Sequence, residues 1–167
     1  MPDTTDIGGD PGKTRDVDAQ EAPAAESDRV VFARVAESAI SVEECAAAVE
    51  GAASGAVVTF AGVVRDHDEG RGVIALSYSA HPSASAVIQE VALDVARAHP
   101  AVTVAVAHRV GDLGIGDVAL ACAVASAHRA EAFAACAALV DEVKAKVPIW
   151  KEQSFDDGTS EWVASIG

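Results

Sequence analysis

Short apolar runs rich in β-branched residues alternate along this chain with longer segments of helical periodicity. The apolar runs predict strands at residues 29–35, 56–65, 73–80, 102–110, 118–126, 149–155 and 161–165. The longer segments predict helices at residues 41–50, 82–99 and 128–146. Ser41 and Glu44 have the spacing of a capping box at the start of the first helix, and Pro100 and Pro148 follow the ends of the other two.

The predicted strands outnumber the helices and mostly follow one another in pairs. This order favours an α+β fold with a mostly antiparallel sheet and flanking helices. The polar segment 66–72 (DHDEGRG) contains two glycines and separates two of the strands. Because such a segment is typical of a hairpin turn, we expect strands 56–65 and 73–80 to pair with each other.

Charge divides the chain into two parts. The whole chain has 26 Asp and Glu against 12 Lys and Arg, which gives a net charge of −14. Residues 1–28 hold eight of these acids but two of the bases, and they contain few large apolar side chains. We therefore expect a disordered acidic tail over residues 1–28, and one folded domain over residues 29–167.

The acidity also bears on partners and location. Nucleic acids and anionic membranes both require a basic protein surface, so neither is an expected partner. No apolar run reaches the length of about 18 residues that a membrane span requires. The N-terminal segment lacks the apolar stretch of a secretory signal, so the sequence predicts a cytoplasmic protein.

The cysteines and histidines do not have the spacing of metal ligands. The cysteines are far apart and form no CxxC pair, so we expect small buried hydrophobes at Cys45, Cys122 and Cys136. His67 and His81 flank the predicted hairpin without an HxH or HxxxH pattern, and His99 and His108 are interpreted as structural. Nucleotide-binding glycine motifs are absent as well, so no metal or cofactor is expected.

The predicted helix 128–146 carries two lysines that are not equivalent. At 100° per residue, Lys144 lies about 20° from Phe133, on the stripe that we expect to face the core. Lys146 lies about 140° from Phe133 and is expected on the solvated face with Glu142. Lys144 then either extends along the apolar face towards water or points into a pocket, where it could act as a base or nucleophile.

Lys151 lies a short distance beyond Pro148. In an extended segment its side chain shares a side with Ile149 and Gln153, so it can approach Lys144 once the chain has reversed. Two adjacent ammonium groups attract an anion. The alternative is an edge-strand lysine that discourages aggregation.

The segment SAHR (126–129) lies where a strand leads into a helix N-terminus. Free backbone N–H groups there, together with His128 and Arg129, could bind a phosphate or carboxylate. Arg129 is expected on the same inward stripe as Phe133. Alternatively, Ser126 only caps the helix and Arg129 pairs with an acid. Arg65, at the end of a predicted strand, could also reach an anionic ligand.

Taken together, several segments resemble the large, catalytic subunit of molybdopterin synthase: FAGVVRDHDEG (60–70), VIALSY (73–78), AHRVGDLGIGD (107–117), SAHR (126–129) and KAKVPIWKE (144–152). The resemblance implies an α/β hammerhead-type fold and a homodimer. Each subunit would bind a small ubiquitin-like sulfur carrier with a Gly-Gly C-terminus, giving a heterotetramer. The family transfers two sulfurs from the thiocarboxylated carrier to cyclic pyranopterin monophosphate and so forms the molybdopterin dithiolene.

The resemblance also implies roles for individual residues. Lys144 and Lys151 match the essential lysines of the family, and Lys146 matches none. The substrate-anion ligands correspond to Arg65, His128 and Arg129. The residues beside them in the matching binding segments are Val63, Val64, Glu152 and Gln153. Two departures are visible: residue 63 is Val where many relatives have Lys, and residues 79–85 differ from the usual pattern of Glu, an aromatic residue and Met.

The length of the helix adds a constraint of its own. Arg129 and Lys144 are 15 residues apart, or about 22 Å at 1.5 Å per residue, so one small pterin cannot touch both in one subunit. We therefore hypothesise that His128 and Arg129 complete the site of the neighbouring subunit. A competing interpretation is a non-catalytic α+β module that binds a phosphorylated metabolite through the same cations.

Overall fold

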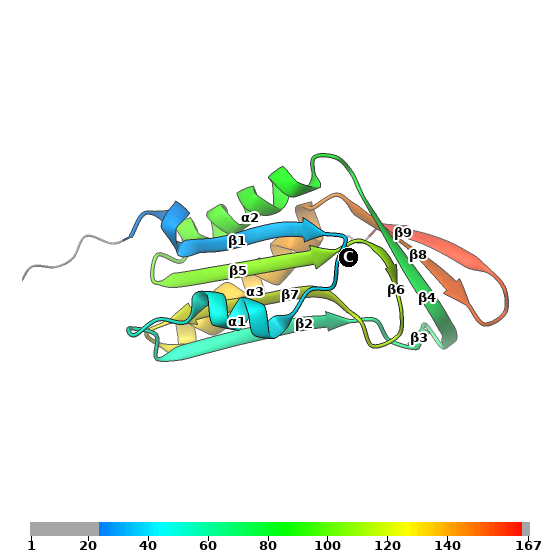
Figure 1. The fold of residues 1–167 in the computed structure, drawn as a ribbon, viewed down its shortest axis with the longest axis horizontal. Helices are drawn as coiled ribbons and strands as arrows, with labels where there is room; N and C mark the ends of the chain where they lie inside the picture. The colour runs from blue at the N-terminus through cyan, green and yellow to red at the C-terminus, as the bar shows by residue number, and fades with distance from the viewer. Residues whose placement is uncertain (1–23, 165–167) are drawn as a thin grey trace, which may run out of the picture.

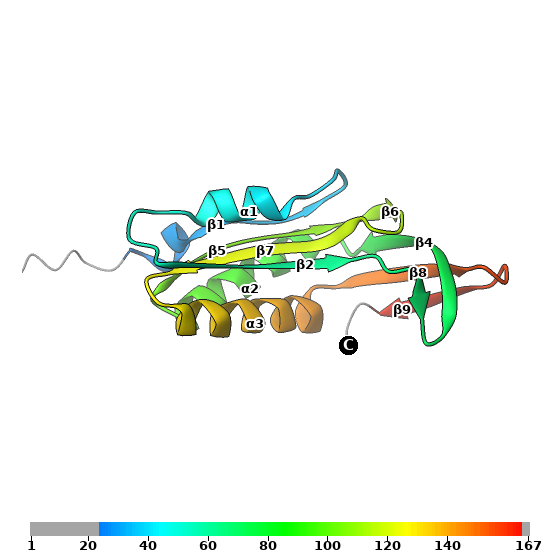
Figure 2. The same cartoon turned by 90° about the horizontal axis from the view of Figure 1, so that it is seen from below.

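The computed structural model describes residues 24–164 of the chain. Its larger sheet has four strands in the order β1 (Val30–Ala36), β5 (Val102–Arg109), β7 (Val118–Ser126) and β2 (Ala56–Val63). Helix α1 (Val42–Val49) covers one face of this sheet, and α2 (Ala84–Ala98) and α3 (Arg129–Lys146) cover the other (Figure 2). A short 3-10 helix, Glu26–Arg29, precedes β1.

Side-chain size separates the two faces of the larger sheet. On β5 and β7 the larger buried side chains, such as Val104, Val106 and Val124, pack with α2 and α3 in the main core. The alternate positions are small, such as Ala105 and Ala123, and they pack beneath α1 with Cys45 and Val49. This follows from the period of two along a strand, which places successive side chains on opposite faces.

A second sheet lies beyond the end of the first (Figure 1). Its strands are β3 (His67–Asp68), β4 (Arg71–Ala80), β8 (Ile149–Phe155) and β9 (Ser160–Ala164), and β6 (Gly111–Leu113) also pairs with β4. Val73, Leu76 and Phe155 form its small core together with Val64 and Leu113. The space between the two sheets is where the candidate site is found.

The predicted hairpin between residues 56–65 and 73–80 is wrong. β2 pairs with β7 along its whole length, whereas β4 pairs with β8. The apolar residues of the two strands serve different cores, because Phe60 packs in the main core and Val73 and Leu76 pack with Phe155. Only the two-residue strand β3 forms a local hairpin with β4.

The predicted α+β class with mostly antiparallel pairing is confirmed, since β1 and β5 form the single parallel pair among the strands described. Most of the predicted tail, residues 1–23, lies outside the described residues. Within residues 24–164, no helix is long and apolar enough to cross a membrane.

Candidate functional site

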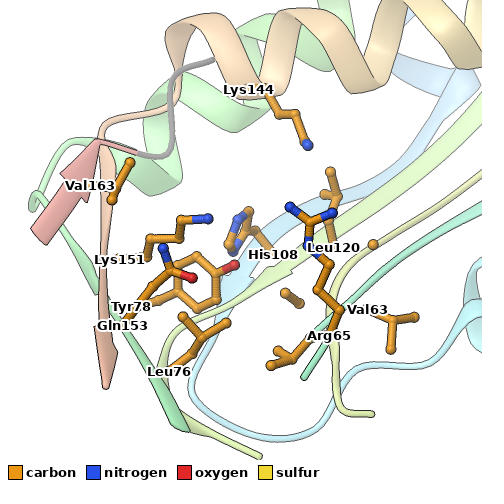
Figure 3. Close-up of a pocket in the computed structure, with 13 residues that line it drawn as sticks. Val63, Arg65, Leu76, Tyr78, His108, Leu120, Lys144, Lys151, Gln153 and Val163 are labelled. Atoms are coloured by element: carbon orange, nitrogen blue, oxygen red, sulfur yellow. The ribbon is translucent and has the colours of Figure 1, made fainter. Parts of the chain in front are cut away.

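A cavity of about 400 Å³ lies between the end of β2, the second sheet and the last turn of α3 (Figure 3). It receives side chains from segments that are far apart in the sequence. The polar and charged residues that line it are Arg65, Tyr78, His108, Lys144, Lys151 and Gln153. Its apolar wall includes Val63, Val64, Leu76, Leu120 and Val163.

Strand β8 contributes to the cavity through simple alternation. Ile149 and Gln153 are buried and Lys151 between them is half-buried, whereas Trp150 is exposed on the other side. The prediction that Lys151 shares a side with Ile149 and Gln153 is therefore confirmed. Lys151 and Lys144 line the same cavity, as the predicted chain reversal requires.

The residues after β2 reach the cavity from the opposite side. Val64 is buried, with 3% of its surface exposed, and Val63 remains half exposed. Arg65 follows them and extends its guanidinium towards the space below Lys144 (Figure 3). Three cations, Arg65, Lys144 and Lys151, thus converge on one cavity of a chain whose net charge is −14.

Three of the sequence-predicted residues do not line this cavity. His128 is the N-cap of α3 and Arg129 is its first residue, so both lie at the opposite end of the helix from Lys144. Both side chains are exposed. Glu152 lies on the face of β8 that points away from Lys151 and Gln153.

The predicted orientation of α3 is also wrong. Its buried residues are Ala132, Ala135, Cys136, Leu139 and Val143. Phe133, the centre of the predicted buried stripe, is 61% exposed, and Arg129 is exposed with it. Lys144 therefore approaches the cavity from the exposed side of α3. Lys146 is exposed, as predicted, and it forms a salt bridge with Glu142.

A hydrogen-bonded acid connects two sides of the cavity. The Nε2 of Gln153 donates to Oδ2 of Asp68 at 2.8 Å, and Nη2 of Arg65 donates to Oδ1 of Asp68 at 2.9 Å. The bond from Gln153 is the main cause of the lowered pKa of Asp68, and Arg65 and Lys151 act in the same direction. Asp68 was not predicted, because nothing in the polar turn distinguishes it from its acidic neighbours.

Tyr78 and His108 form the floor between the lysines. Their rings meet edge to face, with centroids 5.2 Å apart and planes at 77°. Burial raises the pKa of Tyr78 and lowers the pKa of His108, and the charge of Lys144 lowers the latter further. The interpretation of His108 as a purely structural residue is incomplete, since its ring lines the cavity.

The cysteines take no part in this cavity. Cys45, Cys122 and Cys136 are free thiols buried in the cores, as the sequence predicts. Within residues 24–164, no group of three or more His, Cys, Asp or Glu side chains has the arrangement of a metal site. Cations and hydrogen-bonding groups are what the cavity offers, and they suit a small anionic ligand.

Comparison with known proteins places this arrangement in a family. The family model described as MoaE protein matches residues 35–146. This chain belongs to the MoaE protein family. The matched range includes the cavity residues of β2, β4, β5 and α3. The cavity residues of β8 lie just beyond it.

Relatives within the MoaE family are molybdopterin synthase catalytic subunits. The chain is 42% identical over 130 residues to the one from Nostoc sp., which covers 77% of this chain and 78% of the relative. It is 41% identical over 135 residues to catalytic subunit 1 from Mycobacterium tuberculosis, covering 79% and 90%. The crystal structure of molybdopterin synthase from Staphylococcus aureus superposes with a TM-score of 0.74 at 30% identity, covering 79% of this chain and 96% of that one. The recognition of the family and of its enzyme class is thereby confirmed.

Proposed function

We propose that the cavity is the sulfur-transfer site of a molybdopterin synthase catalytic subunit. The observation that carries the proposal is the convergence of Arg65, Lys144 and Lys151 on one cavity of an acidic chain. The substrate is cyclic pyranopterin monophosphate, and the sulfur donor is the thiocarboxylate at the Gly-Gly end of a small ubiquitin-like carrier subunit. The enzyme works in the cytoplasm.

The residues suit the bond changes of this reaction. The thiocarboxylate sulfur attacks a carbon of the pterin side chain, a C–S bond forms, and a C–O bond breaks. Negative charge moves from the sulfur to the departing oxygen, where a preorganised cation stabilises it most. Lys151 and Arg65 are placed to hold the phosphate and this oxygen, and Lys144 is placed to meet the incoming carrier terminus.

Val63, Val64 and Gln153 have supporting roles in this proposal. The two valines form the wall against which the pterin lies, and Gln153 holds Asp68, which in turn holds Arg65. Glu152, on the other face of β8, contributes to the outer surface of the same strand.

His128 and Arg129 enter the proposal through a second subunit. They lie about 22 Å along α3 from Lys144, too far to share one small ligand with it. In a homodimer with α3 antiparallel to its symmetry mate, a two-fold axis beside Cys136 and Ala137 places Arg129 of the partner subunit next to Lys144. Each cavity then gains a fourth cation from its neighbour.

The exposed side of α3 supports this pairing. Phe133 is 61% exposed and lies with Ala137 and Val140 along a shallow groove beside the edge strand β2, where Val58 and Phe60 form the other wall. The same two-fold axis places Phe133 opposite Val140 of the partner subunit. An apolar stripe of this kind is typical of a surface that a second chain covers.

Reconstitution with a thiocarboxylated carrier and the cyclic substrate tests the function. We expect Lys144→Ala to lose dithiolene formation while it stays folded, because Lys144 lines the cavity. Lys146→Ala is the matched control, two residues away on the same helix and outside the cavity, and we expect it to keep wild-type turnover. Binding of the substrate without any turnover by the wild-type chain would instead indicate the non-catalytic module.

A further inference from the structure

His108 presents one ring nitrogen to the cavity and uses the other for support. It stands near the end of β5 with 5% of its surface exposed. Its Nδ1 lies 2.8 Å from the carbonyl oxygen of Arg109. In the view of Figure 3 the ring lies between the side chains of Lys151 and Arg65.

The support determines the tautomer. A carbonyl oxygen only accepts hydrogen bonds, so Nδ1 must carry the proton and donate it to Arg109. The neutral ring then has its lone pair on Nε2, which is the nitrogen left for a ligand. Because burial and the nearby charge of Lys144 lower the pKa of His108, this neutral form persists at pH 7. A neutral imidazole with a fixed, accepting nitrogen is the form that a general base requires.

The proposed sulfur transfer creates a need for such a base. Once the thiocarboxylate sulfur is bonded to the pterin, the carrier is attached to the product through a thioester. Its release consumes one water molecule. We propose that His108 is the general base that activates this water, a role that rests on the proposed function of the cavity.

The bonds balance in this step. Nε2 of His108 takes a proton from water as the oxygen attacks the thioester carbonyl. The C–S bond between carrier and product breaks, and its electron pair stays on the sulfur. The carrier leaves with a carboxylate, the product keeps its sulfur as a thiol or thiolate, and the proton passes from His108 to the sulfur or to solvent. No oxidant or reductant is needed.

The surroundings of the His108 ring suit a general base that releases its proton again after the step. The cavity that the ring lines also holds Lys144 from α3, Lys151 from β8 and Arg65 after β2, and the ring of Tyr78 from β4 meets it edge to face. Burial and the charge of Lys144 disfavour the imidazolium. The three cations of the cavity would stabilise the negative charge that develops on the carbonyl oxygen during attack. The imidazolium formed in the step therefore gives up its proton readily.

His108→Asn is the test, because the Asn Nδ2 can keep the bond to the Arg109 carbonyl while no atom replaces Nε2. Single-turnover reactions with thiocarboxylated carrier and cyclic substrate are followed by intact-protein mass spectrometry. We expect carrier release to slow by about 10²–10⁴-fold and the covalent carrier–product adduct to accumulate. Wild-type release by the variant would overturn the proposal. His99→Asn, at the end of α2 and outside the cavity, is the matched control.

A measurement on the wild-type chain covers the case in which the variant does not fold. The rate of carrier release should stay constant from pH 8 through pH 6.5 and fall only in more acidic solution, because the His108 pKa is lowered from its ordinary value of 6.5. Release that already slows at or above pH 6.5, or that speeds up as the pH falls, contradicts the proposal. A failure of the proposed function is distinct, because the wild-type chain would then form neither adduct nor product.

Discussion

Asp68 is the residue whose removal most directly tests how the cavity wall is held. The side chain of Gln153 is buried, with 3% of its surface exposed, and its amide donates to Asp68 at 2.8 Å. Asp68→Ala leaves this buried donor without its acceptor, which costs about 1–3 kcal/mol. The lost ion pair with Arg65, whose side chain is 68% exposed, adds at most about 1 kcal/mol. Together these contributions predict a loss of about 1–4 kcal/mol in the free energy of unfolding.

Urea denaturation at fixed protein concentration measures this loss. Two further variants test whether the loss comes from the contacts of Asp68. Asp68→Asn keeps an oxygen for Gln153 and should cost less than Asp68→Ala. Asp66→Ala is the control on the same turn, because the Asp66 side chain is 77% exposed and pairs only with His67, so we expect a change within about 0.5 kcal/mol. In a double-mutant cycle, Asp68→Ala and Gln153→Ala should be less costly together than the sum of the two. Equal stability of Asp68→Ala and the wild type would show that the bond between Asp68 and Gln153 does not hold this wall of the cavity.

The pH dependence of the same variant has a defined sign. The folded state lowers the pKa of Asp68 below its ordinary value of 3.8, so its stabilising effect is present above pH 3.8 and is lost as the pH falls towards the lowered value. The stability difference between wild type and Asp68→Ala should therefore shrink in acid. A difference that stays constant down to pH 2 contradicts this account.

Three further predictions concern other parts of the structure. Burial lowers the pKa of His108 below 6.5, so the free energy of unfolding should fall as the pH drops below 6.5. His108→Asn should flatten this dependence. A variant whose stability falls with pH in parallel with the wild type would contradict the prediction. Gly55→Ala should lower the melting temperature by several degrees, because a Cβ would press against the carbonyl oxygen of Ala127; an unchanged melting temperature contradicts this. Leu139→Ala, at a fully buried position of α3, should cost about 2–5 kcal/mol in urea denaturation, and a cost below about 1 kcal/mol would show that α3 is packed differently.

Local periodicity and the motif match together predicted part of the cavity. Alternation along β8 placed Lys151 and Gln153 on one side, and the motif match singled out Arg65 and Lys144. The orientation of α3 could not be read in this way, because apolar residues occur around the whole helix. The largest side chain, Phe133, drew the predicted stripe towards itself, whereas alanines and Leu139 form the buried face.

The remaining site residues depend on tertiary pairing. Asp68 becomes important only because β8 brings Gln153 within hydrogen-bond distance of it. Tyr78 meets His108 because β4 belongs to the second sheet and pairs with β8, not with β2, and this is the pairing that the predicted hairpin missed. Neither of these contacts between distant segments has a signal within the local sequence.

A complementation measurement tests whether the sulfur-transfer cavity is completed across a dimer. Arg129→Ala and Lys144→Ala chains are co-expressed with different tags, and the mixed dimer is isolated. One of its two cavities then has Lys144 together with Arg129 of the partner subunit, and the other has neither. We expect each homodimeric variant to be inactive and the mixed dimer to regain about half of the wild-type dithiolene formation. A mixed dimer as inactive as its parents would contradict this expectation.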